Sequence, residues 1–429
     1  NNADFDITTT RNGIPSTFNF TRNNFELQGL NINDDPVRPL KVKSFAMAIR
    51  NYENFLHDST LSLQFDSILF NKNRIVLSNF NLKQLEHGKV TNSFTVPHCE
   101  LQGLSWDALL FERRLQANQA TLFDPVINYT VHEQPEAGST KKKGLFQYMT
   151  LINNLIRLED FNITNGTLNL DLPGEGDMHL EHTDLSVQSK QLLVSRRITE
   201  FEQSVNSLNF RKGIIHLNGI SAGMLDVHYS GDDNQLTAGS MQLSDKGNKL
   251  QLFAEDVKMN AITLDSTEKN LSLDGISWKQ ADLQLETSPA THLHNGPRSS
   301  LLLEHINGAN TNVRIHGRKQ DITGYIDLVT ADLFKLTTGE KPEINNLAVS
   351  AKNIESHQAG SLVTIGRVTG KDLADTKVEK FHFSDSNSTR HMKMDVPSAF
   401  VVPDLNQLIH GKLQLKDVVL NNPEVDLFF

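Results

Sequence analysis

The chain has 429 residues, of which 38% are hydrophobic and 21% charged, so it can build a core but is too polar for a polytopic membrane protein. Its 51 acidic and 41 basic residues give a net charge of −10, which disfavours electrostatic binding to nucleic acid. The single cysteine, Cys99, excludes an internal disulfide and a zinc site built from cysteines.

Short segments in which apolar and polar residues alternate recur along the chain. They include residues 60–65, 167–172, 236–243, 271–276 and 412–415. A period of two predicts strands with one apolar face and one solvated face. Asn-Gly or Asp-Gly pairs at 165–166, 218–219, 274–275 and 307–308 predict tight hairpin turns. Because such short connections join antiparallel neighbours, we expect a mostly antiparallel sheet.

One segment has a different period. Apolar residues at 145, 146, 148, 149, 152, 155 and 156 recur at spacings of three and four, which predicts an amphipathic helix. A stretch rich in Pro, Gly, Ser, Glu and Lys precedes it. We therefore predict a first β-repeat region at 1–132, an exposed loop at 133–144, and a helix followed by a second β-repeat region at 145–429. Shorter helices are expected near 51–58, 106–113 and 403–409.

Three pairs of segments resemble each other within the chain, as expected of a repeat protein. Residues 45–80 align with 185–220, residues 115–129 with 413–427, and residues 101–106 with 273–278. A Val-Pro pair precedes each copy of the second match, at 96–97 and 396–397. The shared order of these landmarks favours true repetition.

Motifs that carry chemistry are scarce. Neither the phosphate-binding motif GxxxxGK[ST] nor the zinc motif HExxH occurs. His179 and His182 are three residues apart, which on a regular strand places them on opposite faces and disfavours a shared metal. His98 and Cys99 are neighbours and would also face opposite ways, which disfavours a nucleophilic pair. We expect no enzyme activity, no catalytic residues, no metal and no cofactor.

A chain of amphipathic strands must hide its apolar face in a barrel, a sandwich or a long trough. A trough that is apolar inside and open along one side suits acyl chains. The residues of one candidate stretch of lipid-contacting lining are Phe161, Ile163, Leu168, Leu170 and Leu172. The alternative, which the sequence leaves open, is that these side chains form an ordinary core between the sheet and a helix.

Two parts of the chain resemble the AsmA-like proteins of the Gram-negative envelope. One is the predicted helix followed by Leu-x-x-Phe-x-Ile-x-Asn-Gly-x-Leu-x-Leu at 158–170, and the other is the strand, proline, strand step at 115–127. The resemblance implies a mostly β fold in which repeated strands form an elongated curved sheet or groove, with a few short amphipathic helices. It implies bridge-like transfer of phospholipid or another acyl-chain lipid between the inner and outer membranes, which supports outer-membrane biogenesis.

The resemblance also implies a periplasmic setting, a tether to the inner membrane and protein partners in the envelope. The chain opens with Asn1 and shows no apolar run of about 18 residues, so we expect the anchor to lie outside this segment. Two other classes of function stay open. One is a structural or adhesive β-repeat scaffold that binds protein or glycan, and the other is a carbohydrate-active β-solenoid enzyme, for which we find no acidic cluster.

Overall fold

The computed structural model describes most of the chain as strands and turns. The described residues are 3–11, 14–28, 31–32, 40–41, 44–56, 61–71, 73–86, 88–105, 115–130, 156–172, 176–188, 204–217, 220–245, 247, 249–265, 270–287, 300–317, 320–337, 343–358, 360–371, 375–385, 391–403 and 414–428. They contain no helix, and hence none that could cross a membrane. The described strands divide into two units, Asn1–Leu217 and Asn218–Phe429.

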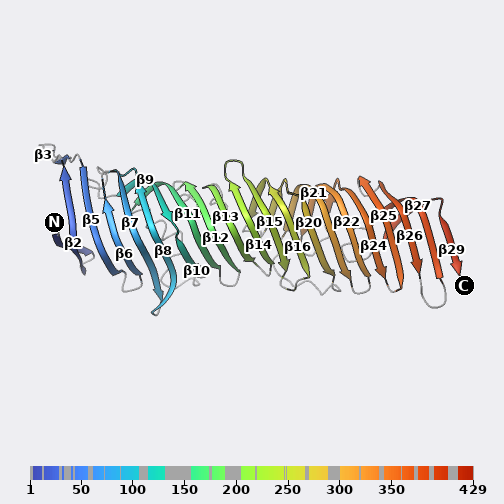
Figure 1. Cartoon of the computed structure of the whole chain (residues 1–429), viewed down its shortest axis with the longest axis horizontal. Coiled ribbons are helices and arrows are strands. Elements are labelled where there is room, and N and C mark those ends of the chain that lie inside the picture. Colours follow the sequence, from blue (N-terminus) through green and yellow to red (C-terminus); the bar gives the residue numbers. More distant parts are fainter. Residues whose placement is uncertain are drawn as a thin grey trace. The chain divides into compact units, whose positions relative to one another are not determined.

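The first unit is a ladder of long strands (Figure 1). Its strands are β1 (Ala3–Arg11), β2 (Ile14–Gln28), β3 (Asn31–Ile32), β4 (Leu40–Lys41), β5 (Ser44–Leu56), β6 (Leu61–Phe70), β7 (Arg74–Glu86), β8 (Lys89–Gln102), β9 (Leu115–Phe123), β10 (Val126–Thr130), β11 (Ile156–Leu172), β12 (Gly176–Gln188) and β13 (Val205–Leu217). Neighbours pair antiparallel from β1 through β2, β5, β6 and β7 to β8. The two-residue strands β3 and β4 are outside this ladder and pair with each other in a separate sheet. Both β9 and β10 then pair with β8. The strand β11 pairs parallel with β9 and β10, and the ladder continues antiparallel through β12 to β13.

The second unit repeats this plan. Its strands are β14 (Ile220–Ser230), β15 (Gln235–Asp245), β16 (Leu250–Met259), β17 (Ala261–Asp265), β18 (Asn270–Asp274), β19 (Ser277–Trp278), β20 (Gln280–Thr287), β21 (Ser300–Gly317), β22 (Gln320–Thr337), β23 (Glu343–Asn345), β24 (Ala348–Gln358), β25 (Ser361–Lys371), β26 (Asp375–Asp385), β27 (His391–Pro403), β28 (Leu415–Asn421) and β29 (Glu424–Phe428). The strand β21 pairs parallel with β18, β19 and β20. The remaining ladders are antiparallel. They run from β14 to β16, from β16 to β19 and β20, from β17 to β18, and from β21 to β29.

The predicted mostly β fold is confirmed, with two corrections. The sheet is mixed, because β11 and β21 each enter it parallel to the preceding strands. A few short helices are predicted, but the described residues have none. Residues 51–56 of the helix predicted near 51–58 belong to β5. The helices predicted at 106–113, 145–156 and 403–409, and the loop at 133–144, lie outside the described residues, except that Ile156 belongs to β11 and Pro403 to β27.

Most long strands share a bend at which their alternation shifts by one residue. Two successive residues there face the same, polar side, and apolar residues resume on the other side. These pairs are 66–67, 78–79, 97–98, 164–165 and 181–182 in the first unit, and 225–226, 239–240, 255–256, 352–353, 366–367, 379–380 and 397–398 in the second. At most of these bends the partner strand carries the same shift, so the two strands keep their register across the bend.

Backbone conformation explains which residues occupy the bend. Seven of them have φ between 49° and 55°, a region that few side chains tolerate. They are Asn79, Asn165, His182, Asp226, Asp256, Asn353 and Lys380. Pro97 and Pro397 lie in the strands opposite Asn79 and Lys380, where the register skips a pair. Proline is tolerated there because the position is skipped in the pairing, so the ladder needs no N–H from it, which accounts for the two Val-Pro landmarks.

Three of the four predicted hairpin turns are wrong, and the fourth, at 218–219, lies outside the described residues. Asp274-Gly275 joins β18 to β19, which both run parallel to β21 and do not pair with each other. Asn165-Gly166 lies inside β11 and Asn307-Gly308 lies inside β21. Asn165 supplies the positive φ of a bulge instead of a turn. Gly308 is required for a different reason, because a Cβ at this position would lie 2.0 Å from Cζ2 of Trp278.

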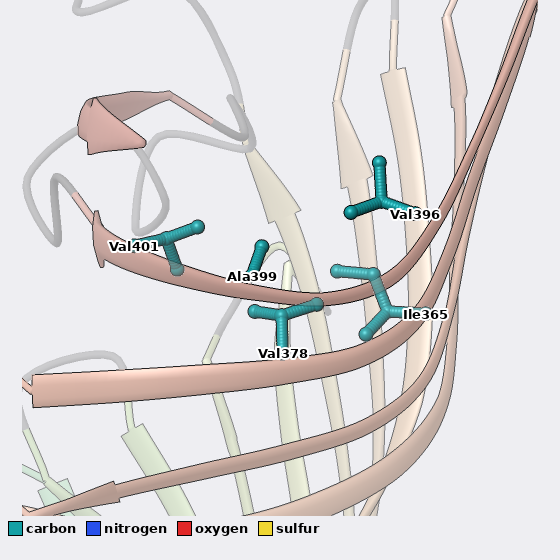
Figure 2. Close-up of a cluster of buried hydrophobic side chains, with 5 residues drawn as sticks. All are labelled: Ile365, Val378, Val396, Ala399 and Val401. Atoms are coloured by element: carbon teal, nitrogen blue, oxygen red, sulfur yellow. The ribbon is translucent and has the colours of Figure 1, made fainter. Parts of the chain in front are cut away.

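Buried side chains gather at the bends. In the second unit the cluster consists of Ile365, Val378, Val396, Ala399 and Val401. Figure 2 shows these side chains on the concave side of the curved strands. In the first unit Val96, Cys99, Leu122 and Ile163 form a similar cluster. We call the side that carries these clusters the apolar face, and the opposite side the polar face.

Candidate functional site

The predicted lining residues all lie on β11. Ile163 is 4% exposed and packs with Val96 and Leu122, while Phe161 and Leu168 are partly buried against this cluster. Leu170 is half-buried, and the side chain of Leu172 lies outside the described part of the structure. The five-residue step from Ile163 to Leu168 would reverse the face on a regular strand. The bend at 164–165 shifts the alternation by one residue, so Ile163 and Leu168 both lie on the apolar face.

Half-buried hydrophobic side chains extend the apolar face on either side of each bend. In the first unit they include Phe80, Phe94, Ile127, Leu168 and Leu185. In the second unit they are Ile354, Val363, Val368, Phe381 and Met394. The apolar face therefore has a buried line of small aliphatic groups at the bend and more accessible groups beside it.

These residues of the second unit were not predicted as lining. Their strands carry a signal that a search for strict period two misses, namely two alternating runs separated by two polar residues. In β25, for example, Val363 and Ile365 precede the bend, and Val368 follows it after Gly366 and Arg367. A search for the pattern apolar-x-apolar-x-x-apolar-x-apolar would have found them.

Hydrogen bonds between side chains hold the polar face at the bend of β11. Asn165 donates from its side-chain amide to Asp124, and its backbone N–H donates to Oδ1 of Asp184 at 2.8 Å. Nδ1 of His182 is hydrogen-bonded to Oδ1 of Asn165 at 2.7 Å. These contacts join β11 and β12 to the turn between β9 and β10, and so stabilise a backbone conformation that is costly by itself.

The expectation that His179 and His182 face opposite ways is wrong. The bend at 181–182 places both on the polar face, where Nε2 of His179 lies 2.8 Å from Oε1 of Glu181 and His182 contacts Asn165. Each histidine thus has its own partner. Within the described residues, no group of three or more His, Cys, Asp or Glu side chains could hold a metal ion.

Residues 219–223 read Gly-Ile-Ser-Ala-Gly, the spacing of the nucleophile elbow of α/β-hydrolases. That motif needs a strand that ends in a sharp turn, with the serine exposed at the start of a helix. Ser221 instead lies near the beginning of β14, pairs with Ser244 of β15 and is followed by nine more strand residues. The geometry gives no support for a nucleophilic serine here.

Cys99 is a core residue. Burial, and then the charge of Glu100, raise the pKa of its thiol to about 12. The imidazole of His98 bonds to Glu100 at 3.0 Å, on the other face of β8. Because the thiolate is the reactive form of cysteine, burial and the raised pKa disfavour Cys99 as a nucleophile near neutral pH.

We expect the folded protein to resist alkylation at Cys99. Maleimide at pH 7.5 should label it at least about 100-fold more slowly than it labels the protein in denaturant, because the buried thiol stays protonated. Intact mass against time measures the rate. Equal rates in the two conditions would show that the apolar cluster around Cys99 opens readily.

Thr183 has the one buried side-chain oxygen or nitrogen without a hydrogen-bond partner among the described residues. Its side chain is fully buried on the apolar face of β12. Thr183→Val should raise the free energy of unfolding by about 1 kcal/mol, because it removes an unsatisfied hydroxyl and keeps the shape. Thr311→Val is the control, since Thr311 accepts a 2.9 Å hydrogen bond from Trp278. Urea unfolding measures the change. A loss of stability in Thr183→Val would contradict the finding that the Thr183 hydroxyl has no hydrogen-bond partner.

Comparisons with known proteins give no relative from which a role could be transferred. No protein-family model matches the chain. No curated protein matches it either.

Proposed function

We propose that the apolar face binds the acyl chains of lipids and that the protein handles lipid without catalysing a reaction. The observation that carries this proposal is the phase shift at each bend. It keeps apolar side chains on one side of strands up to 17 residues long, while the polar side carries the charged and amide groups. The half-buried state of Leu168, Phe381 and Met394 supports it, since side chains in a closed core would be fully covered.

The energetics of such binding are favourable. Each CH₂ group removed from water contributes about 0.8 kcal/mol, so a 16-carbon chain contributes on the order of 10 kcal/mol if fully covered. The line of apolar groups repeats from strand to strand in each unit. Neighbouring positions on it therefore offer similar binding energy, and an acyl chain could move along the face without crossing a high barrier.

The proposal includes the cellular setting implied by the resemblance to AsmA-like proteins. The protein would lie in the periplasm of a Gram-negative bacterium, tethered to the inner membrane by a segment outside this sequence. It would conduct phospholipid between the two membranes and support outer-membrane biogenesis, with envelope proteins as partners.

A second candidate is a structural or adhesive scaffold that binds protein or glycan. The fully buried clusters favour it, because Val96 and Val396 are 0% and 1% exposed, as in a filled core. In that case the apolar face would serve only folding, and the polar face would meet the partner.

Paired variants of β11 distinguish the two functions. Leu170→Asp places a charge on the apolar face, and we expect it to reduce binding of a fluorescent fatty acid at least tenfold, since a bound chain would have to desolvate the carboxylate. Asn169→Asp adds the same charge one residue away on the polar face, where Asn169 donates to Oδ1 of Asn128 at 2.7 Å. It should bind the probe as the unmodified protein does.

Both variants need circular dichroism and urea unfolding as controls for folding. Equal loss of binding in two folded variants would contradict the assignment of the apolar face as the lipid site. Absence of binding by the unmodified protein would favour the scaffold.

A further inference from the structure

A continuous chain of hydrogen bonds crosses four strands on the polar face of the first unit. Asn128 of β10 donates from Nδ2 to Oγ of Ser93 on β8 at 2.8 Å, and Asn169 of β11 donates from Nδ2 to Oδ1 of Asn128 at 2.7 Å. Nδ1 of His179 on β12 is hydrogen-bonded to Oδ1 of Asn169, and its Nε2 lies 2.8 Å from Oε1 of Glu181. The first four residues lie opposite one another in the strand register. We call the five residues together the polar chain.

The carboxylate of Glu181 fixes one end of the polar chain. Its pKa is lowered, first by the hydrogen bond with His179 and also by the charge of Lys212, whose Nζ lies 3.6 Å from Oε1. Glu181 therefore stays ionised near neutral pH, and an ionised carboxylate only accepts hydrogen bonds. Nε2 of His179 must carry a hydrogen to bond with it.

The other nitrogen of the His179 ring faces a second acceptor. Asn169 uses its amide nitrogen on Asn128, so its Oδ1 is turned toward Nδ1 of His179. With an oxygen acceptor on each side, both ring nitrogens carry hydrogen, which is the state of the charged imidazolium. The arrangement in the structure thus belongs to protonated His179.

A neutral His179 requires the amides of the polar chain to turn. Its one hydrogen stays on Nε2 toward Glu181, and Nδ1 becomes an acceptor. Asn169 then has to present Nδ2 to His179 and Oδ1 to Asn128, and Asn128 has to turn in the same way. Ser93 completes the reversed chain, because a hydroxyl can donate as well as accept. Each turn exchanges an oxygen and a nitrogen of similar size, so no hydrogen bond is lost.

We propose that His179 and the polar chain form a pH-sensitive switch, in which loss of a proton from His179 reverses the hydrogen bonds as far as Ser93. Imidazole is the side-chain group that ordinarily changes charge between pH 5 and 8. The hydroxyl of Ser93 accepts a hydrogen bond in the charged state and donates one in the neutral state. Protonation on β12 is thus expressed on β8, across the parallel pair of β10 and β11. The inference does not depend on lipid binding.

Other titratable groups on the polar face lie near His179 on its own strand and on both neighbouring strands. They are Asp171 on β11, Asp177 and Glu181 on β12, and Lys212 and His216 on β13. His216 bonds to Asp177 at 2.9 Å. These charges act on the pH at which the switch turns, whereas the reversal itself needs the two amides that connect His179 to Ser93.

His182 provides an internal control on the same strand. Its Nδ1 is hydrogen-bonded to Oδ1 of Asn165, and Asn165 donates from Nδ2 to the carboxylate of Asp124. Because that carboxylate only accepts, the Asn165 amide cannot turn without losing a bond, and the Nδ1–H of a neutral imidazole already satisfies its oxygen. Protonation of His182 therefore leaves the Asn165 amide in place.

Nuclear magnetic resonance of the protein labelled with ¹⁵N in asparagine and histidine tests the switch. As the pH rises from 5 to 8.5, Nδ1 of His179 should lose its hydrogen while Nε2 keeps one. The side-chain amide signals of Asn169 and Asn128 should change with the same midpoint, although Asn128 lies two strands, or about 10 Å, from the ring. Single substitutions assign the signals, including that of His216.

Three results would overturn the proposal. One is an Asn128 amide signal that stays constant while His179 titrates, and another is a His179 ring that keeps one protonation state throughout. The third is an equal response of the Asn165 amide to His182, which would show that these signals report charge alone.

A pair of variants separates the polar chain from the direct effect of charge. Asn128→Asp can only accept, so it holds Asn169 in the orientation of the charged state and should raise the pH midpoint of His179 by about 0.5 or more. In an Asn169→Leu background the same carboxylate is present without the connecting amide. At high salt, which screens the direct interaction, the shift should then disappear. Equal shifts in the two backgrounds, in variants shown to be folded by circular dichroism, would contradict the switch.

Discussion

Val396→Asp is expected to lower the free energy of unfolding of the second unit by more than about 4 kcal/mol, the range reached when an unpaired charge is buried. Val396 is 1% exposed and packs at the bend with Ile365, Val378 and Ala399. A carboxylate there has lost its water and gains no cation. The unit would unfold, or the strands would separate at the bend to admit water. Urea unfolding followed by far-ultraviolet circular dichroism measures the change.

Phe400→Asp is the matched control on the same strand. Phe400 is 49% exposed and lies between two buried residues of the apolar face, so its side chain is on the polar face. The same charge there should change stability by less than about 1 kcal/mol. Similar losses in the two variants would mean that the two faces of β27 do not differ as the structure indicates.

Gly308→Ala is expected to destabilise the second unit by at least about 2 kcal/mol, as overpacking does when the neighbours are rigid. Its methyl group would lie 2.0 Å from Cζ2 and 2.2 Å from Cε2 of the Trp278 ring. The ring would have to move, and its Nε1 would then lose the 2.9 Å hydrogen bond to Thr311. A change in tryptophan fluorescence should accompany the lower urea midpoint.

Gly223→Ala serves as the control for Gly308→Ala. A Cβ at position 223 of β14 meets no atom within 4 Å, and alanine restricts the unfolded chain more than glycine does. Its stability should equal or slightly exceed that of the unmodified protein. If Gly308→Ala were equally harmless, the packing of Trp278 against β21 would be incorrect.

The sequence predicted the class of fold well, because the apolar alternation that specifies strands is local. It also identified the Val-Pro landmarks and the two copies of the strand, proline, strand step. Parallel insertion of β11 and β21 was missed, since it depends on pairing between segments far apart in the chain. Asn165-Gly166 was misread as a turn, because positive φ at asparagine serves a bulge as well as a hairpin.

The five residues predicted to line the trough all lie on β11. Ile163 and Leu168 were grouped although their spacing contradicts a regular strand, and the bend at Asn165 explains why both lie on one face. The same one-residue shift recurs in most long strands of both units. Recognition of this shift would also have corrected the placement of His179 and His182, whose separation of three spans such a shift.

Native mass spectrometry of the unmodified protein, purified under mild conditions and followed by extraction and identification of bound lipid, is the most direct test of lipid binding by the apolar face. We expect phospholipid to remain bound in near-stoichiometric or higher amounts and to be lost from Leu170→Asp but kept by Asn169→Asp. A folded, lipid-free protein that also fails to take up added phospholipid would contradict the proposed function, and the bent sheet would then be a scaffold with a filled core.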